Sequence, residues 1–153
     1  MASGASSAII IDRSVEDVWK YVTDISNMPL WEDSAAVWKQ TSAGPLGLGT
    51  TIQSSIRALG RTVRFDLRVT EFEVNRTFSV EAVAGRTRGT TVSYVFAPIG
   101  ERTTRLSRVT VAQFHGILKV LQPFVGLITT RTGQLEARNV KRLMESDGNS
   151  EAP

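Results

Sequence analysis

Apolar residues recur at three- and four-residue intervals in the last quarter of the chain. Ile117, Leu121, Phe124 and Ile128 follow this spacing, which is the signature of one face of a helix. Other apolar residues fill the remaining sides, yet the stretch is too polar and too short for a membrane span of about 20 apolar residues. The pattern predicts a long core helix over residues 116–146, about 45 Å long at 1.5 Å per residue, with a kink near Pro123.

The first quarter of the chain predicts a strand followed by two short helical segments. Residues 8–11 form a short, β-branched run, which we interpret as a strand buried on both faces or nearly so. Ser14 follows as a helix cap with Asp17 three residues later, an approximate capping box. The helix that starts there has an apolar stripe made of Val15, Val18, Trp19 and Val22. A second short helix or turn is expected over residues 26–31.

Between residues 36 and 114 the pattern has a period of two, as in strands whose side chains alternate between two faces. Turn sequences divide this region at residues 44–49, 60, 73–76, 85–89 and 98–101. The glycines of the first turn lack the lysine of a phosphate-binding loop and the spacing of a dinucleotide fingerprint. We therefore interpret this segment as a turn. Tight turns predict the opposed pairs Ile52–Leu67, Ser54–Phe65, Ile56–Val63, Val69–Val80, Leu67–Ala82 and Arg68–Glu81.

These elements predict an α+β fold in a single domain spanning residues 1–153, with loose termini at 1–6 and 147–153. A curved antiparallel sheet of about seven strands would wrap around the long C-terminal helix, with the two short helices between strands one and two. The parity of the last strand stays open, because Leu106 and Val109 cannot both point inward without a bulge. The inner face of the sheet is expected to consist of Phe65, Leu67, Val69, Phe78, Val80, Tyr94 and Phe96.

This order of elements resembles a known family. The stripe from Val15 to Trp19, Trp31 after Pro29, the loop 44–50 and the ending 135–144 are similar to the polyketide cyclase/dehydrase and lipid-transport branch of the SRPBCC superfamily, related to the birch-pollen allergen. The resemblance covers residues 8–145 and includes no catalytic motif. It implies a helix-grip fold with a deep apolar cavity between sheet and helix, in which members bind or act on hydrophobic small molecules.

Composition and charge narrow the classes of function. The chain has a net charge of +3 and no cysteine, which excludes disulfides and thiolate chemistry. Its basic residues are spread along the sequence, so we predict no nucleic-acid partner. The N-terminus lacks the basic region of a secretory signal, and nothing indicates an oxidising compartment. We therefore expect a cytoplasmic protein.

Candidate catalytic residues are few. His115 is the only histidine and lies at the predicted junction of the last strand and the long helix, where it could act as a general base near neutral pH. The alternative is a capping or surface role. Tyr94 and Glu71 are its candidate helpers if the predicted register places them inside. With one histidine, no cysteine and no clustered carboxylates, we predict no metal site and no cofactor.

Candidate ligand-binding residues follow from the predicted cavity. Sites for hydrophobic ligands are lined by aromatic and branched side chains with a few polar groups. For each residue the alternative is a packed core without a cavity. We expect Trp19 in the core and both Trp31 and Trp38 near an entrance. The candidates are Trp31, Ser54, Phe65, Leu67, Phe78, Val80, Tyr94, Phe96, Phe124 and Ile128.

Three hypotheses for the function remain. The first is a carrier or sensor that binds a lipid or polyketide-like molecule in the cavity. The second is a cyclase or dehydratase in which Tyr94 or His115 moves a proton. The third is a protein interaction module that uses the sheet edge or a basic face. We expect a hydrophobic small molecule as partner, no stable membrane insertion, and a monomer or homodimer.

Overall fold

The computed structural model describes residues 3–27, 37–58, 60–113, 115–116, 134 and 137–145. Within these residues seven strands form one antiparallel sheet in the order β1-β7-β6-β5-β4-β3-β2. The strands are β1 (Ser3–Ile11), β2 (Val37–Gln40), β3 (Thr51–Ala58), β4 (Arg61–Glu73), β5 (Thr77–Ala82), β6 (Thr91–Gly100) and β7 (Thr103–Ala112). The helical segments are α1 (Val15–Val22), the 3-10 turns η1 (Ile25–Asn27) and η2 (Gly85–Thr87), and residues 137–145.

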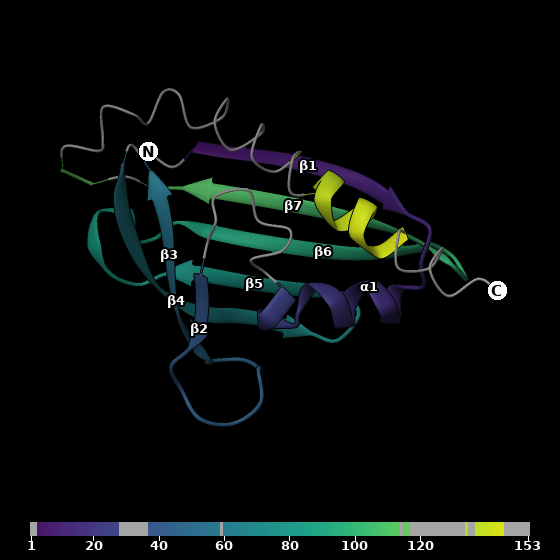
Figure 1. Cartoon of the computed structure of the whole chain (residues 1–153), viewed down its shortest axis with the longest axis horizontal. Helices are drawn as coiled ribbons and strands as arrows, with labels where there is room; N and C mark the ends of the chain where they lie inside the picture. The colour runs from purple at the N-terminus through teal and green to yellow at the C-terminus, as the bar shows by residue number, and fades with distance from the viewer. Residues whose placement is uncertain are drawn as a thin grey trace.

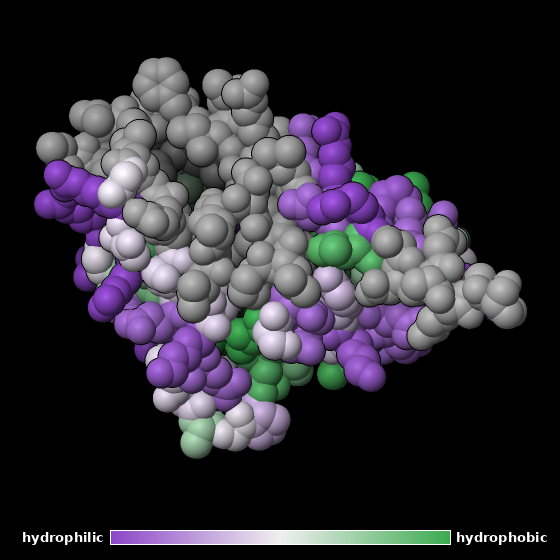
Figure 2. Space-filling view, in the orientation of Figure 1, coloured by the Kyte–Doolittle hydropathy of each residue, from purple (hydrophilic) through white to green (hydrophobic). Residues whose placement is uncertain are grey.

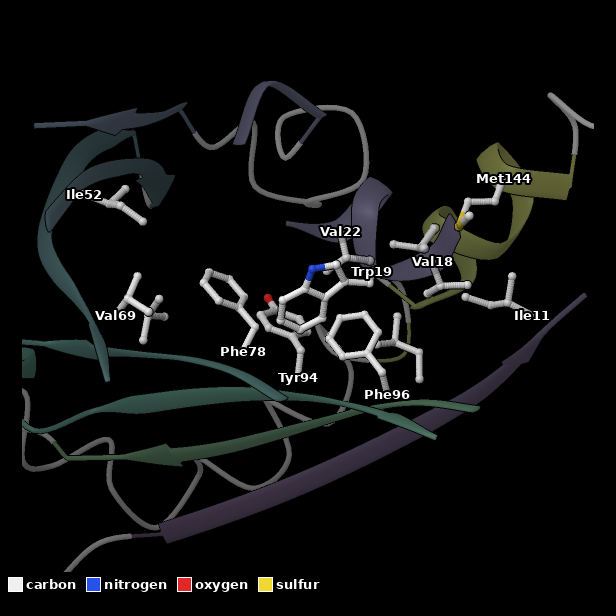
Figure 3. Packing of buried hydrophobic residues seen from close by; sticks show 13 residues of the cluster. Ile11, Val18, Trp19, Val22, Ile52, Val69, Phe78, Tyr94, Phe96 and Met144 are labelled. Atoms are coloured by element: carbon white, nitrogen blue, oxygen red, sulfur yellow. The ribbon is translucent and has the colours of Figure 1, made fainter. Parts of the chain in front are cut away.

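Helix α1 and the C-terminal helical segment lie over the same face of the sheet (Figures 1 and 3). The predicted α+β fold of helix-grip type is confirmed in this arrangement. Of the helix predicted over residues 116–146, the structure describes helical residues at 134 and 137–145. The expected kink at Pro123 and the turn around Trp31 lie outside the described residues.

Strand β1 differs from the sequence prediction in length and in burial. It begins at Ser3 and so includes most of the segment that we expected to be loose. Ile11 is fully buried, whereas Ile10 is 45% exposed, so the prediction of burial on both faces is wrong. β1 is an edge strand of a sheet with one covered face, and neighbouring side chains of a strand point to opposite faces.

The predicted pairing of the central strands is confirmed. Ile52, Ser54 and Ile56 oppose Leu67, Phe65 and Val63 across β3 and β4. The pairs Val69–Val80, Leu67–Ala82 and Arg68–Glu81 join β4 to β5. The glycine-rich segment 44–49 is a turn that leads into β3, as predicted, and the Gly49 amide donates to the Val69 carbonyl over 2.9 Å.

A bulge after Val69 corrects the position of Glu71. Val69 opposes Val80, but Glu71 opposes Ser79, so one extra residue is inserted in β4. An inserted residue reverses the alternation of side chains beyond it. Phe72 therefore faces inward opposite Phe78, and Glu71 is exposed. The prediction that Glu71 lies inside the fold as a helper of His115 is therefore wrong.

The structure also decides the parity of β7. Leu106 pairs with Phe96 and is buried, whereas Val109 is 36% exposed on the outer face. Every second residue of an extended strand shares a face. The inner face of β7 is therefore formed by Thr104, Leu106, Arg108, Thr110 and Ala112.

Much of the packed core lies at one end of the sheet, under α1 and residues 137–145, and Ile52 and Val69 extend it to β3 and β4 (Figure 3). Ser14 caps α1 by accepting a hydrogen bond from the Asp17 amide, as the sequence predicts. Trp19 then reaches the sheet and meets the rings of Phe72 and Phe96 edge to face, with centroids 5.2 and 5.0 Å away. Figure 3 shows Trp19 and Phe96 close to each other, with Val18, Ile11 and Met144 in the same cluster.

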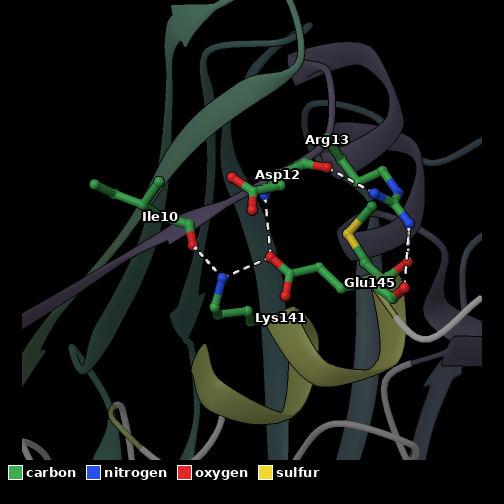
Figure 4. A network of polar contacts seen from close by, with 6 residues as sticks. Ile10, Asp12, Arg13, Lys141 and Glu145 are labelled. Atoms are coloured by element: carbon green, nitrogen blue, oxygen red, sulfur yellow. Dashed lines mark hydrogen bonds and ion pairs between the residues drawn. The ribbon is translucent and has the colours of Figure 1, made fainter. Parts of the chain in front are cut away.

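Polar contacts attach the C-terminal helix to the end of β1 (Figure 4). The Lys141 ammonium donates to the Ile10 carbonyl over 3.1 Å and to the Glu145 carboxylate. The Asp12 amide donates to the same carboxylate over 3.2 Å, and the Arg13 guanidinium donates to the Met144 carbonyl over 3.0 Å. Hydrophilic residues accordingly predominate in the coloured surface around this helix (Figure 2).

We predict that Glu145→Gln makes the stability of the protein less dependent on acidic pH. The hydrogen bond from Lys141 lowers the pKa of the Glu145 carboxyl from its ordinary value of 4.5. A lowered pKa stabilises the fold above the ordinary value, and this contribution is lost as the pH falls through the folded-state pKa. Because the Lys141–Glu145 pair is partly exposed, we expect the free energy of unfolding of Glu145→Gln to be only about 0.5 kcal/mol below that of the wild type at pH 7. At pH 3 the difference should be smaller. Urea unfolding at pH 7 and pH 3 measures it. An equal deficit at both values would contradict the prediction.

Candidate functional site

The inner face of the sheet changes from packed core to open cavity along its strands. In β6, Phe96 is buried in the core, whereas Val92, four residues earlier, lines a cavity. In β7, Leu106 belongs to the core and Thr110 to the cavity wall. The cavity has a volume of about 270 Å³, several times the roughly 30 Å³ that one water occupies in the liquid. It therefore has room for more than an isolated structural water.

The described part of the cavity wall is mostly apolar, with polar residues contributed by several elements. The apolar lining comes from β2, β4, β5, β6 and β7 and consists of Trp38, Phe65, Leu67, Val80, Ala82, Val92 and Ala112. The polar lining consists of Ser54, Thr87, Thr90, Tyr94, Arg108 and Thr110. This combination of an apolar wall with a few polar groups is typical of small-molecule sites.

The structure divides the predicted ligand-binding residues into three groups. Ser54, Phe65, Leu67, Val80 and Tyr94 line the cavity, and Trp38 joins them. Phe78 and Phe96 are buried in the core next to Phe72 and Trp19 rather than in the described cavity wall. Trp31, Phe124 and Ile128 lie outside the described residues. The predicted core position of Trp19 is confirmed, since it is 8% exposed.

Tyr94 stands where the core meets the cavity. Its ring stacks on Phe78, with centroids 6.1 Å apart and planes 17° from parallel, and Figure 3 shows the two side chains next to each other. Tyr94 is 3% exposed and also lines the cavity. The packed face of the ring thus holds this phenol in a defined position in the cavity wall.

His115 is exposed and bonded to a neighbouring loop. Its amide donates to the Arg86 carbonyl over 2.7 Å, and its Nε2 atom lies 2.9 Å from the Arg88 carbonyl oxygen. A carbonyl oxygen can only accept, so this contact requires a proton on Nε2. In the described structure His115 is outside the cavity wall. These contacts connect the end of β7 to the loop that contains η2.

Arg108 is a charged residue of the cavity wall that was not among the predicted ligand-binding residues. It faces inward between Leu106 and Thr110 on β7, opposite Tyr94 on β6, and its Nε and Nη1 atoms are buried. Directly opposed residues of antiparallel strands have Cβ atoms about 4.5–5.5 Å apart. Counting in twos from an inward-facing Leu106 would have identified Arg108, but the competing choice of Val109 left the parity open.

Neither a cluster of metal-ligating side chains nor a membrane-spanning helix is found within the described ranges. No group of three or more histidine, cysteine or carboxylate side chains placed to hold a metal ion occurs among these residues. Likewise, no helix in the part of the chain that the structure describes is long and apolar enough to cross a membrane.

Comparison with known proteins decides the family. Residues 4–145 match the profile of the family described as polyketide cyclase/dehydrase and lipid transport. The chain belongs to this family. In this member of the family, the candidate functional site is the apolar cavity on the inner face of the sheet. Among proteins of curated function, none matches the chain in sequence.

Solved structures share the fold of this family member at low sequence identity. A START superfamily protein from Mycobacterium smegmatis has a TM-score of 0.80 and 15% identity, covering 94% of this chain and 97% of its own. The Zhui aromatase/cyclase from Streptomyces sp. R1128 has a TM-score of 0.78 and 9% identity, covering 99% and 98%. Norcoclaurine synthase from Thalictrum flavum has a TM-score of 0.69 and 13% identity, and the similarity covers 97% of each chain. These similarities establish the fold alone.

Proposed function

We propose that this protein is a cytoplasmic carrier or sensor that binds a hydrophobic small molecule, lipid-like or polyketide-like, in the cavity on the inner face of the sheet. The observation that carries the proposal is the cavity of about 270 Å³ with its mainly apolar wall. Protein interiors are normally close-packed, with few voids larger than a water molecule. Burial of apolar ligand surface against such a wall contributes roughly 25 cal/mol per Å².

A polyketide cyclase or dehydratase activity is the second candidate. It is favoured by the family match and by the buried phenol of Tyr94 in the cavity wall. Of the two predicted proton carriers, Tyr94 is the better placed, because the Nε2 atom of His115 is engaged with the Arg88 carbonyl outside that wall. Both residues remain proposals for catalysis.

The proposed function predicts saturable uptake of a neutral apolar probe. N-phenyl-1-naphthylamine fluoresces strongly only in apolar surroundings, so titration should give a one-to-one isotherm with a Kd of roughly 1–10 μM, or about −7 to −8 kcal/mol. Unlabelled 1-decanol should displace it. Tyr94→Phe should retain the affinity within about threefold if the protein is a carrier.

The outcomes separate the hypotheses. A Tyr94→Phe variant that still binds but no longer converts a poly-β-keto test substrate, which the wild type cyclises, would identify an enzyme. Absence of saturable uptake by protein that unfolds cooperatively would reject the cavity-based functions and favour a protein interaction module.

A further inference from the structure

The side chains around Arg108 make the cavity amphipathic. Leu106 and Phe96, next to Arg108 and Tyr94 on the inner face, are buried in the core. Arg108 and Tyr94 therefore mark the end of the cavity that adjoins the core, and the hydroxyl of Thr110 lies two residues further along β7. The β4 and β5 side of the wall is formed by Phe65, Leu67, Val80 and Ala82. The end near Arg108 thus offers a cation and hydroxyl groups, whereas the β4 and β5 side is mainly hydrocarbon, with Ser54 of β3 beside Phe65.

We infer that the ligand is an amphiphilic acid, with one anionic oxygen group, such as a carboxylate or sulfonate, held by Arg108 and an apolar body lying against β4 and β5. This inference rests on the proposed function and adds the chemical class of its ligand. The anionic end reaches the part of the cavity next to the core, and the apolar body occupies the rest.

The chemistry of arginine supports an acid over a neutral polar group. The guanidinium keeps its charge at every physiological pH and presents five N–H donors in a planar fork that matches a carboxylate. Arg108 already has an interaction partner within the protein, and a guanidinium, with five donors, can bind more than one acceptor. Hydrogen bonds between charged groups are about twice as strong as neutral ones. Apolar surroundings strengthen the attraction further, since the local dielectric is low.

A matched pair of probes tests this class. 1-Anilinonaphthalene-8-sulfonate has the same rings as N-phenyl-1-naphthylamine and adds a single sulfonate. In Arg108→Gln we expect the affinity for the sulfonate probe to fall roughly 10- to 100-fold, whereas that for the neutral probe changes less than about threefold. Arg108→Lys should restore part of the sulfonate affinity, because the charge is kept and the fork is lost.

Arg105→Gln is the control for net charge. Arg105 lies on the same strand, exposed, and pairs with Ile10 and Ala97 on the outer face of the sheet. Arg105→Gln removes one positive charge, as Arg108→Gln does, but outside the cavity. Both probes should therefore bind this variant within about twofold of their wild-type affinity. An equal loss of both probes in Arg108→Gln, no loss of the sulfonate probe, or the same loss in Arg105→Gln would overturn the inference.

A measurement on the wild-type protein keeps the test independent of folding in the variants. Decanoate should displace N-phenyl-1-naphthylamine at a concentration at least about tenfold lower than decanamide at pH 8. Displacement at equal concentrations would reject the acid class while leaving the hydrophobic-ligand function intact. If the neutral probe does not bind the wild type at all, the proposed function fails and the inference falls with it.

Discussion

Replacing Trp19 by alanine is expected to lower the free energy of unfolding by about 3–5 kcal/mol. Trp19 is 8% exposed and makes edge-to-face contacts with Phe72 and Phe96. With Val18 and Val22 it forms the buried face of α1. Removal leaves a cavity that the surrounding strands can close only in part. For a domain of this size the melting temperature should fall by about 6–20 °C.

Urea unfolding followed by circular dichroism measures this effect. Trp19→Phe retains an aromatic ring and should cost less than half as much. Lys20→Ala is the matched control, since Lys20 neighbours Trp19 on α1 but is exposed, and it should change stability by no more than about 0.5 kcal/mol. A loss below about 1 kcal/mol in Trp19→Ala would show that α1 does not hold the core end in the way described.

Replacing Ala82 by tryptophan is expected to weaken uptake of N-phenyl-1-naphthylamine by at least about 100-fold, or 2.7 kcal/mol. Ala82 is 3% exposed, lies on β5 opposite Leu67, and lines the cavity. An indole ring attached there occupies a large part of the 270 Å³ volume, so the probe loses its space. Because the ring enters an existing cavity, we expect a stability cost below the 1–3 kcal/mol that is usual for overpacking.

Glu81→Trp is the control for this substitution. Glu81 precedes Ala82 on the same strand and opposes Arg68 on the outer face. Glu81→Trp introduces a tryptophan whose ring lies on the outer face and not in the cavity. The affinity for the probe should therefore stay within about threefold of wild type. If Ala82→Trp does not unfold cooperatively, Ala112→Trp blocks the same cavity from β7. Unchanged uptake in a folded cavity-blocking variant would place the probe elsewhere and contradict the proposed site.

Local patterns were sufficient for the fold and for much of the cavity wall. The alternation along β3, β4 and β5, together with short turns, determined the register from Ile52 to Ala82, because a shift of one residue would expose every apolar side chain. The same alternation identified Ser54, Phe65, Leu67, Val80 and Tyr94 as inward-facing, and all five line the cavity. The cap at Ser14 and the stripe ending at Trp19 followed from residues only a few positions apart.

Only the tertiary structure decided where the inner face is packed and where it is open. Phe78 and Phe65 share the inner face of the sheet, yet Trp19 covers the region of Phe78, whereas Phe65 borders the cavity. The bulge that turns Glu71 outward and the parity that turns Arg108 inward also depend on neighbouring strands. Sequence periodicity predicts which face of the sheet a side chain points to. Whether that face is packed depends on another element that is distant in the sequence, and local periodicity does not contain this information. The packing of α1 covers one end of the inner face, and the register between β6 and β7 places Arg108 in the cavity wall.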